Sequence, residues 1–492
     1  MKTVCIIGGG LGGLITGALL SKEGYQITVL EKNHIIGGGL QYFRREGHSF
    51  DPCMHIFGGM QQEGNLRLIL EYLDVIDKLT FEPYYETIAN GEETITLPWG
   101  RDAWIEAIGQ GRFKKELNAY VDALNRYANS EDLFNIRPYS NEKHEEPNIS
   151  AQKLISQYVS DPKLQDRLAY VTNLYDGTAD SPALIHALTC VLHINGIYSI
   201  SPSVHCLAET LCDIIIAGGG TIYKNSAVTS IEANHEEVTA VICDKNRFEA
   251  DYYISAISIG ALLRIAPQTA FSTAFRKRIT AAHQCCSAFC LYGILKPHTT
   301  PFHHECYHIS RPKSNPWNIT ECPPDQWPQN MFLMLQADND DPRYASEFNI
   351  VAPMDYDYVR QWEDTSTGHR PDNYQQWKKQ MADQAIQLAQ NTIGQLEIEK
   401  IYTASPLTFR DFNNTTQGTC YGLHPSVDNP LLTTLSTRTR LKNLFLTGQD
   451  VNFHGMVGTA LTAILTSETI VGQNIIVNKI LQKHSSSKNN NA

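Results

Sequence analysis

Short apolar runs at the start of the chain alternate with a helical stretch and with glycines. Thr3–Ile7 is a β-rich run, Leu11–Lys22 reads as a helix, and Gln26–Leu30 is a second β-rich run. Gly24 marks the end of the helix before the second run begins. This order predicts a strand, a helix and a second strand, as in a parallel βαβ unit.

The turn after the first predicted strand carries closely spaced glycines. Gly8, Gly10 and Gly13 give the pattern G-x-G-x-x-G, and Gly12 lies between them. Glycine permits a tight turn and lets the backbone approach a pyrophosphate, and the helix N-terminus offers free N–H groups to the phosphates. Glu31 follows the second strand, where a carboxylate can bind ribose hydroxyls. We therefore predict a dinucleotide site; a glycine-rich surface loop is the alternative.

A related pattern lies near the end of the chain. Leu444–Leu446 reads as a short strand, and Gly448 and Asp450 follow it in a polar turn. Apolar residues at helical spacing then begin near residues 455–457. The pattern predicts a strand, a turn and a helix. Taken alone, it also fits an ordinary surface corner.

The middle of the chain supplies further pieces of the same domain. Residues 203–216 read as a helix, and short alternating segments between residues 221 and 253 read as a small β-meander. We predict an α/β fold in which a discontinuous, Rossmann-like dinucleotide-binding domain is built from residues 1–72, 202–269 and 429–480. The insertions at residues 73–201 and 270–428 are expected to form an α+β substrate domain. Residues 481–492 are polar and are expected to be a disordered tail.

One long helix is predicted within the second insertion, at residues 373–396. Its apolar face carries Tyr374, Trp377, Met381 and Leu388, a spacing that favours core packing over a ligand site. Both insertions are rich in aromatic residues, so an apolar, aromatic pocket is expected.

Length and charge indicate a protein with more than one core and argue against nucleic-acid binding. A chain of 492 residues is too long for one core, and its net charge of −12 argues against a nucleic-acid surface. The apolar stretches are too short or too polar for a transmembrane helix, so we expect lipid contact to be peripheral and weak. Met1 and Lys2 lead directly into the first strand, which leaves no room for a signal peptide. A cytoplasmic protein is expected.

The spacing of the cysteines and histidines indicates neither disulfides nor a metal site. The 12 cysteines form no C-x-x-C pair, which favours free thiols in a reducing compartment. His303, His304, Cys306 and His308 are close in sequence but fit no standard ligand set, and we expect this segment to be a loop. We predict no metal site.

A second glycine cluster identifies the cofactor more closely. Gly37, Gly38 and Gly39 follow Glu31 after five residues, and this arrangement resembles the extended motif of glutathione-reductase-like and amine-oxidase-like FAD proteins. Residues 443–473 resemble the C-terminal motif of those families, in which an acid at the position of Asp450 holds the ribityl chain. The resemblance implies non-covalent FAD. NAD as the only cofactor is the alternative, and NAD(P)H remains open as an electron donor.

Three blocks resemble the phytoene desaturase, carotenoid isomerase and retinol saturase group. They are residues 47–59, with F-D-P-C-M-H; residues 405–422, with S-P-L-T and Y-G; and residues 443–458. The last two blocks resemble retinol saturases in particular. The resemblance implies an FAD-dependent oxidoreductase that acts on carbon–carbon double bonds of an apolar isoprenoid or polyene substrate. Saturation is preferred, ahead of desaturation and cis–trans isomerisation.

The same motifs imply the site residues. The catalytic candidates, which could handle a proton beside the flavin, are His454, His55 and Tyr421. The predicted cofactor-binding residues are Gly8, Gly10, Gly12, Gly13, Glu31, Lys32, Gly37, Gly38, Gly39, Leu40, Val228, Gly448, Asp450, Gly455, Met456 and Val457.

Several alternatives stay open. His55 also fits a structural histidine bonded to backbone, His454 a helix cap, and Tyr421 ordinary packing. Two other functions remain: an amine-oxidase-like flavoenzyme, and a flavin-containing lipid-binding protein without turnover. The sequence leaves the oligomeric state open.

Overall fold

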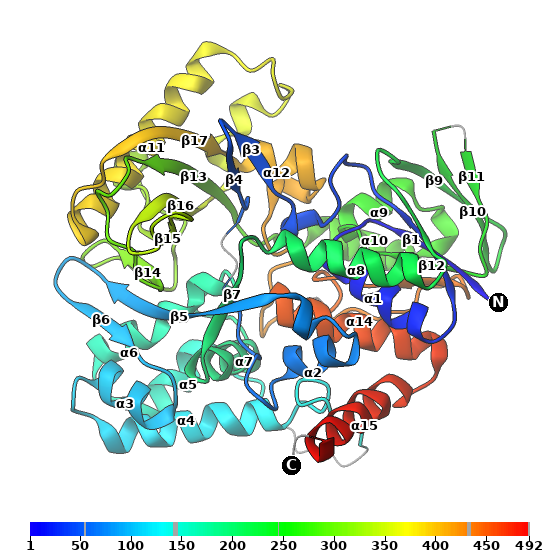
Figure 1. Cartoon of the computed structure of the whole chain (residues 1–492), viewed down its shortest axis with the longest axis horizontal. Coiled ribbons are helices and arrows are strands. Elements are labelled where there is room, and N and C mark those ends of the chain that lie inside the picture. The colour runs from blue at the N-terminus through cyan, green and yellow to red at the C-terminus, as the bar shows by residue number, and fades with distance from the viewer. Residues whose placement is uncertain (54–55, 141–145, 245, 431–433, 491–492) are drawn as a thin grey trace.

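Two sheets organise the computed structural model, which describes residues 1–53, 56–140, 146–244, 246–430 and 434–490. In Figure 1 a parallel sheet with its helices lies to the right, near the N-terminus, and a larger mixed sheet lies to the left. A helical bundle lies below the larger sheet. Segments far apart in the sequence therefore build each part.

The first sheet has five parallel strands in the order β18-β12-β1-β2-β8. Their bounds are Leu444–Leu446, Tyr252–Ser255, Thr3–Ile7, Gln26–Leu30 and Thr221–Tyr223. Val4 and Ile6 point to one core, while Cys5 and Ile7 point to another on the opposite face. Both faces of β1 are buried because side chains alternate along a strand and parallel sheets are covered on both sides.

Helices cover one face of this sheet and a meander covers the other. The helices are α1 (Leu11–Lys22), α8 (His205–Ala217) and α14 (Gly455–Val471), and α1 packs against both of its neighbours. The antiparallel meander consists of β9 (Val228–Ala233), β10 (Val238–Cys243) and β11 (Asn246–Phe248). The predicted Rossmann-like fold is confirmed, including the N-terminal βαβ unit and the C-terminal strand and helix.

The second sheet has the order β17-β13-β16-β15-β14-β5-β6, and β7 pairs with the first half of β5. The bounds are β5 Thr80–Ala89, β6 Thr94–Leu97, β7 Ile197–Ser201, β13 Ser287–Leu295, β14 Glu305–Ser310, β15 Asn330–Ala337, β16 Ala345–Met354 and β17 Ile398–Ala404. The segment around His308 is therefore strand β14, and the expected loop is wrong there. Local spacing missed it because β14 gains its pairing from β5 and β15, which lie far away in sequence.

Helix α11 (Asp372–Ile393) covers this sheet with its apolar face. Met381 and Leu388 belong to the sheet's core, and Tyr374 is buried in a smaller cluster beside it, with Trp377 packed against both clusters. The predicted core-facing stripe is confirmed.

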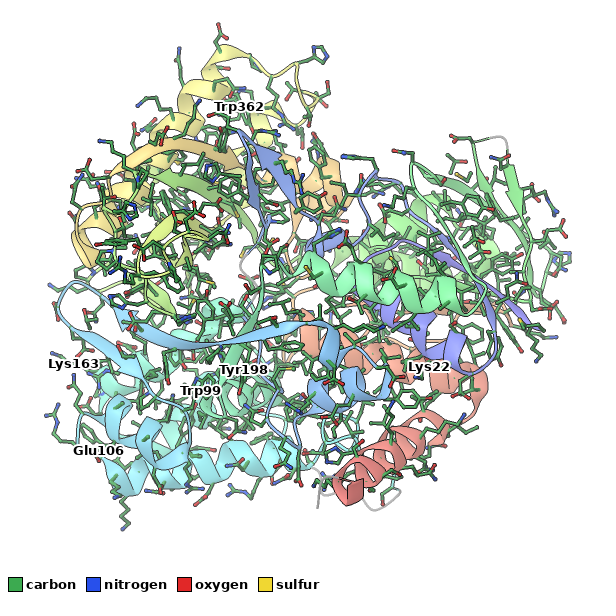
Figure 2. The ribbon with its side chains drawn as sticks, viewed as in Figure 1. Lys22, Trp99, Glu106, Lys163, Tyr198 and Trp362 are labelled. Carbon is green, nitrogen blue, oxygen red and sulfur yellow. The ribbon has the colours of Figure 1, made fainter. Side chains whose placement is uncertain are left out.

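The bundle consists of α3 (Arg101–Gly109), α4 (Lys114–Asn129), α5 (Ala151–Tyr158), α6 (Pro162–Leu168) and α7 (Ala183–Ile194). It shares a core with β5 and β6, which contribute Ile88, Ile95 and Leu97. Figure 2 shows Trp99 and Tyr198 close together below β5; their ring centroids are 4.9 Å apart.

Short elements complete the chain. They are β3 (Phe43–Arg45), β4 (His48–Phe50), α2 (Asn65–Tyr72), α9 (Ile259–Ile265), α10 (Thr273–Ala281), α12 (Pro406–Asn413) and α15 (Ile475–Asn490). The hairpin of β3 and β4 packs against Tyr292 on β13, although it lies within residues 1–72.

The disordered tail predicted from residue 481 is wrong as far as Asn490, because α15 continues to that residue. Ile476 and Ile480 bury one face of the helix, and Lys479 and Lys483 contact Glu23 and Asp74. Packing of this apolar face against the rest of the protein, together with the ion pairs, orders the helix despite its polar composition. Among the described residues, no single helix is long and apolar enough to cross a bilayer. Only α14 together with residues 475–488, a pair bent by 118°, meets the criteria of length and composition.

Candidate active site

A cavity of about 490 Å³ lies against the glycine turn of β1 and α1 and extends to residues of both sheets. One part of its wall comes from the turn, from residues 256–258 directly after β12 and from the start of α14. Another part is apolar and comes from α7, β15 and β16. Its side chains include Ile185, Leu188, Leu192, Phe332 and Val351.

Backbone segments approach each other closely in the glycine-rich part of the wall. A Cβ added at Gly38, where φ is +60°, would lie 2.9 Å from the Cα of Gly10. A Cβ at Gly12 would lie 2.9 Å from the Cα of Gly448. A side chain at Gly38 would push the two N-terminal glycine segments apart, and one at Gly12 would push the N- and C-terminal motifs apart. Glycine is therefore required for packing as well as for ligand access.

Glu31 holds the turn in place. Its Oε2 accepts a hydrogen bond from the N–H of Gly9 at 2.9 Å, and its Oε1 accepts one from the N–H of Asn33 at 2.8 Å. Burial raises the pKa of the Glu31 carboxyl above its ordinary value. The carboxylate thus lies on the cavity wall where the sequence predicts a ribose ligand.

The C-terminal motif presents a helix end to the cavity. Gly455, Met456 and Val457 line it at the start of α14, and no side chain caps this terminus. The free N–H groups and the positive end of the helix dipole favour negative charge at this wall. Asp450 accepts the N–H of Ile259 at 2.7 Å, and burial raises the pKa of Asp450 to about 6.

The cavity gathers the predicted cofactor residues. All of them line it except Gly13, which lies behind the turn. A Cβ at Gly13 would be 2.3 Å from the carbonyl oxygen of Gly8, so this glycine lets the helix approach the strand. Their roles in cofactor binding stay a prediction.

Two of the three catalytic candidates lie together on the cavity wall. The rings of Tyr421 and His454 are nearly parallel, at 11°, with centroids 5.9 Å apart. Burial, with a smaller contribution from His424, lowers the pKa of His454 to about 4, and burial raises that of Tyr421 well above its ordinary value. Both are therefore neutral at pH 7. His454 occupies the N-cap position of α14, but its side chain makes no capping hydrogen bond. His55 lies outside the described residues.

A buried acid–histidine cluster beside the cavity was missed by sequence reasoning. His193, on α7, lines the cavity, and its Nδ1 lies 2.9 Å from Glu86 Oε1. His308 Nε2 lies 2.8 Å from the same oxygen, and the Tyr170 hydroxyl donates to Glu86 Oε2 at 3.0 Å. Burial alone would raise the pKa of Glu86, but the two imidazoles hold it well below its usual range. The cluster places a carboxylate-backed imidazole on the cavity wall.

Comparison with known proteins identifies the family. Residues 11–294 match the model of the family described as flavin containing amine oxidoreductase, and this match covers more than half of the chain. The chain belongs to this family. It is a flavin-dependent oxidoreductase.

Similar proteins extend the family match over the rest of the chain. All-trans-retinol 13,14-reductase of Macaca fascicularis is 23% identical, and the alignment covers 96% of this chain and 86% of that protein. The 4,4'-diaponeurosporene oxygenase of Staphylococcus haemolyticus is 24% identical over 52% of this chain and 55% of its own length. The predicted resemblance to retinol saturases and carotenoid enzymes is confirmed.

Solved structures share the fold of this flavin-dependent oxidoreductase. An oxidoreductase from Methanosarcina mazei superposes with a TM-score of 0.65 at 15% identity, covering 95% of this chain and all of that one. Putrescine oxidase bound to putrescine gives a TM-score of 0.65 at 11% identity, covering 96% and 99%. At these identities, the likeness shows the fold alone.

The cavity of this flavin-dependent oxidoreductase fits a polar cofactor. Three buried atoms on its wall have no hydrogen-bond partner among the described residues: Asn173 Oδ1, Thr415 Oγ1 and His454 Nδ1. These three atoms are enclosed within the wall and are not open to the cavity. The glycine turn and the free N–H groups at the start of α14 fit a pyrophosphate, and Tyr421 and Phe332 on the same wall fit the aromatic character of a flavin dinucleotide.

Proposed function

We propose that this enzyme binds FAD non-covalently and acts on a carbon–carbon double bond of an apolar isoprenoid or polyene substrate. The observation that carries the proposal is one cavity that joins the dinucleotide turn to an apolar wall of Leu188, Leu192 and Phe332. The retinol reductase and diaponeurosporene oxygenase relatives support the substrate class, since their names refer to a retinoid and a carotenoid.

The charges on the wall support an uncharged substrate. Among the described lining residues, the acidic side chains are Glu31 and Asp450, and both accept backbone N–H groups near the turn. An ammonium group bound against the apolar wall would have no carboxylate partner there, and burying an unpaired charge is costly. Burial of apolar surface would supply the binding energy for a polyene.

Flavin supplies hydride transfer when it is bound. The chain's own residues would hold the substrate against it, exclude water and manage one proton. In the saturating direction a proton must reach the carbon that does not receive the hydride. Tyr421 carries a neutral hydroxyl on the cavity wall, and His193 carries an imidazole oriented by Glu86. These are the proton-handling groups that we propose, with His454 beside Tyr421.

Saturation is the direction we prefer, because the S-P-L-T and Y-G blocks resemble retinol saturases. The S-P-L-T block forms the start of α12, where Ser405 and Thr408 make a capping box, and Tyr421 of the Y-G block lies on the cavity wall. We further propose NAD(P)H as the electron donor.

The decisive experiment is anaerobic. The purified enzyme is reduced, retinoids, carotenoids and quinone-like lipids are added in turn, and the flavin spectrum and product mass are recorded. Saturation predicts flavin reoxidation with a product two mass units heavier. Bleaching of oxidised flavin with a lighter product indicates desaturation, and an unchanged mass with altered retention indicates isomerisation. If none of these lipids exchanges electrons or is converted, the proposal is wrong.

Amine oxidation is the second candidate. The parallel rings of Tyr421 and His454 favour it, because amine oxidases often place an aromatic pair around a neutral amine. Peroxide release with amines, and with no polyene, would select this function.

We also propose a cytoplasmic protein with weak peripheral lipid contact. The acidic balance of the chain disfavours anionic headgroups. Sedimentation with anionic vesicles that is reversed by salt would contradict this.

A further inference from the structure

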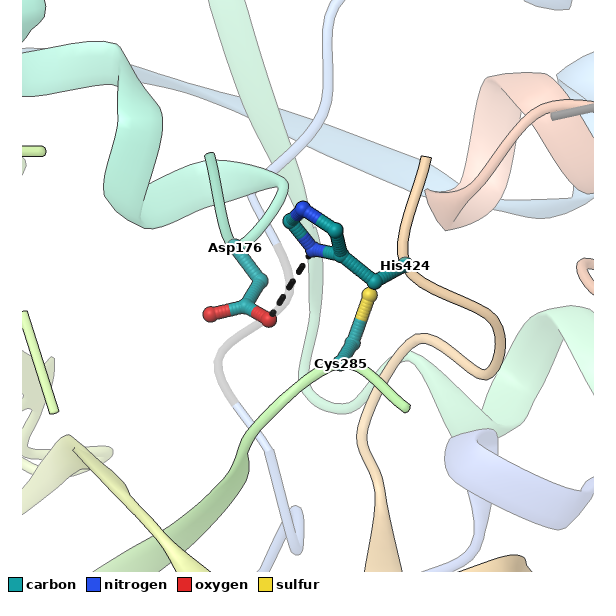
Figure 3. A group of neighbouring side chains, drawn as sticks. All are labelled: Asp176, Cys285 and His424. Carbon is teal, nitrogen blue, oxygen red and sulfur yellow. Dashed lines mark ion pairs between the residues drawn. The ribbon is translucent and has the colours of Figure 1, made fainter. Parts of the chain in front are cut away.

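Three side chains of metal-binding type meet behind the cavity wall. Figure 3 shows Asp176, Cys285 and His424 converging from three different segments. Their ligand atoms all lie within 4.8 Å of one another, and Asp176 Oδ2 is 3.8 Å from His424 Nδ1. Zinc bonds of about 2.0–2.3 Å in a tetrahedral site place neighbouring ligand atoms roughly 3.3–3.8 Å apart. The cluster is therefore at, or within about 1 Å of, that geometry.

The hydrogen bonds around His424 fix which of its nitrogens carries the proton. The Thr178 hydroxyl donates to Asp180 Oδ1 at 2.5 Å, so its oxygen is free to accept. His424 Nε2 lies 3.2 Å from that oxygen and donates to it. With Nε2 bonded to Thr178, the other ring nitrogen, Nδ1, faces Asp176. Metal-binding histidines are oriented in this way, with the second ring nitrogen donating to a fixed acceptor.

Asp180 is the acceptor at the end of this series of hydrogen bonds, which runs from His424 through Thr178. Ser426 donates to its Oδ2 at 2.6 Å. Although burial alone would raise the pKa of Asp180, the Ser426 and Thr178 hydroxyls hold it below its ordinary value. Asp180 is thus an ionised acceptor, and the orientation of the Thr178 hydroxyl follows from it.

His424 Nδ1 and Asp176 Oδ2 face each other across 3.8 Å. Asp176 Oδ2 already accepts the N–H of Cys286 at 2.7 Å, so the aspartate is held in this position. A ring nitrogen and a carboxylate oxygen at this separation are too far apart for a hydrogen bond and leave room for a cation that contacts both. Cys285 adds a sulfur ligand on the same side.

We propose that Asp176, Cys285 and His424 bind a zinc ion. A set of one sulfur, one imidazole nitrogen and one carboxylate oxygen matches the ligands that zinc accepts, and solvent would fill the fourth position. On binding, the Cys285 S–H bond breaks, an S–Zn bond forms, and the proton passes to solvent.

The site would fix the wall of the cavity. Asp176 follows Tyr175, Cys285 precedes Cys286, and the His424 loop carries Tyr421; these three neighbours line the cavity, whereas the zinc ligands do not. A metal bridging the three segments would hold those neighbours in register without taking part in the chemistry.

The test is the metal content of the holoenzyme, purified without chelators. We expect one zinc per chain, and after removal and replacement with cobalt(II), d–d bands at wavelengths beyond flavin absorption. Cys285→Ser and His424→Gln should each lose at least ten-fold in zinc affinity. Cys243→Ser, which changes a buried cysteine in β10, should retain the metal. Flavin content and circular dichroism check that each variant folds.

Two results would overturn the proposal. One is a wild-type enzyme that neither contains zinc nor binds it on titration. The other is zinc retained equally by wild type and by both ligand variants, which would place the metal elsewhere.

Discussion

Glu86 Oε1 lies 2.9 Å from His193 Nδ1 and 2.8 Å from His308 Nε2. One carboxylate oxygen therefore lies within ion-pair distance of two imidazoles, of which His193 also hydrogen-bonds to it, and all three side chains are at least nine-tenths buried. Only one of the two histidines, His193, lies on the cavity wall. Within this cluster only His193 is therefore placed to contact a bound substrate.

This asymmetry gives the first prediction. His193→Gln and His308→Gln should destabilise the protein similarly, because each removes one partner of a buried carboxylate, at a cost of about 3–5 kcal/mol. Only His193→Gln should also slow the proton-dependent step, by about 10²–10⁴-fold if His193 moves the proton. Denaturant unfolding and single-turnover kinetics measure the two effects separately. Equal turnover in both variants would assign His193 a structural role.

Gly38 and Gly39 are adjacent but differ in what a side chain would meet. At Gly38, φ is +60° and an added Cβ would approach Gly10, whereas at Gly39 nothing lies within 4 Å. Gly38→Ala should therefore cost the apoprotein about 1–2 kcal/mol for the left-handed backbone, with a further cost from the contact. Gly39→Ala is the matched control and should leave apoprotein stability nearly unchanged. Chemical denaturation of both flavin-free variants measures the difference; equal losses would mean that the two glycine segments do not approach as described.

How much the sequence could predict depends on the range of the interactions. The βαβ unit and the strand before α14 were correctly predicted because their signals lie within short stretches of sequence. These signals are the spacing of apolar residues, the turn glycines and the position of Asp450 after its strand. Glu86, His193 and His308 come from β5, α7 and β14, and only the parallel pairing of β5 with β14 brings two of them together. Asp176, Cys285 and His424 likewise lie far apart in the sequence. The expectation of no metal site considered only residues that are close in sequence, so it could not take this cluster into account.

Acid stability of the apoprotein tests the burial of His454. Its folded pKa of about 4 lies below the ordinary 6.5, so the folded state resists protonation. The stability that comes from neutral His454 is present above pH 6.5 and is lost as the pH falls towards 4. Wild type should therefore lose more stability than His454→Gln between pH 7 and pH 4.5, as measured by urea unfolding.

Asp450 should give the opposite dependence of stability on pH, because burial raises its pKa instead of lowering it. Its folded pKa of about 6 lies above the ordinary 3.8, so its contribution is present below pH 3.8 and is lost as the pH rises through 6. Relative to Asp450→Asn, wild type should become less stable on the alkaline side of this window. If the unfolding free energy changes with pH in the same way for wild type and both variants, neither group is buried as described.

Tyr421 offers a direct test of proton delivery. Its hydroxyl is neutral because burial raises its pKa, and its ring lies parallel to His454 on the cavity wall. Tyr421→Phe removes the donor but keeps the ring. If Tyr421 supplies the proton, reoxidation of the reduced enzyme by its polyene should slow by about 10²–10⁴-fold, with flavin content and reduction by the electron donor unchanged. Tyr402→Phe, on β17 and outside the cavity lining, should behave as wild type. Wild-type reoxidation in Tyr421→Phe would transfer the role to His193 or His454, and the His193→Gln kinetics would then distinguish these two.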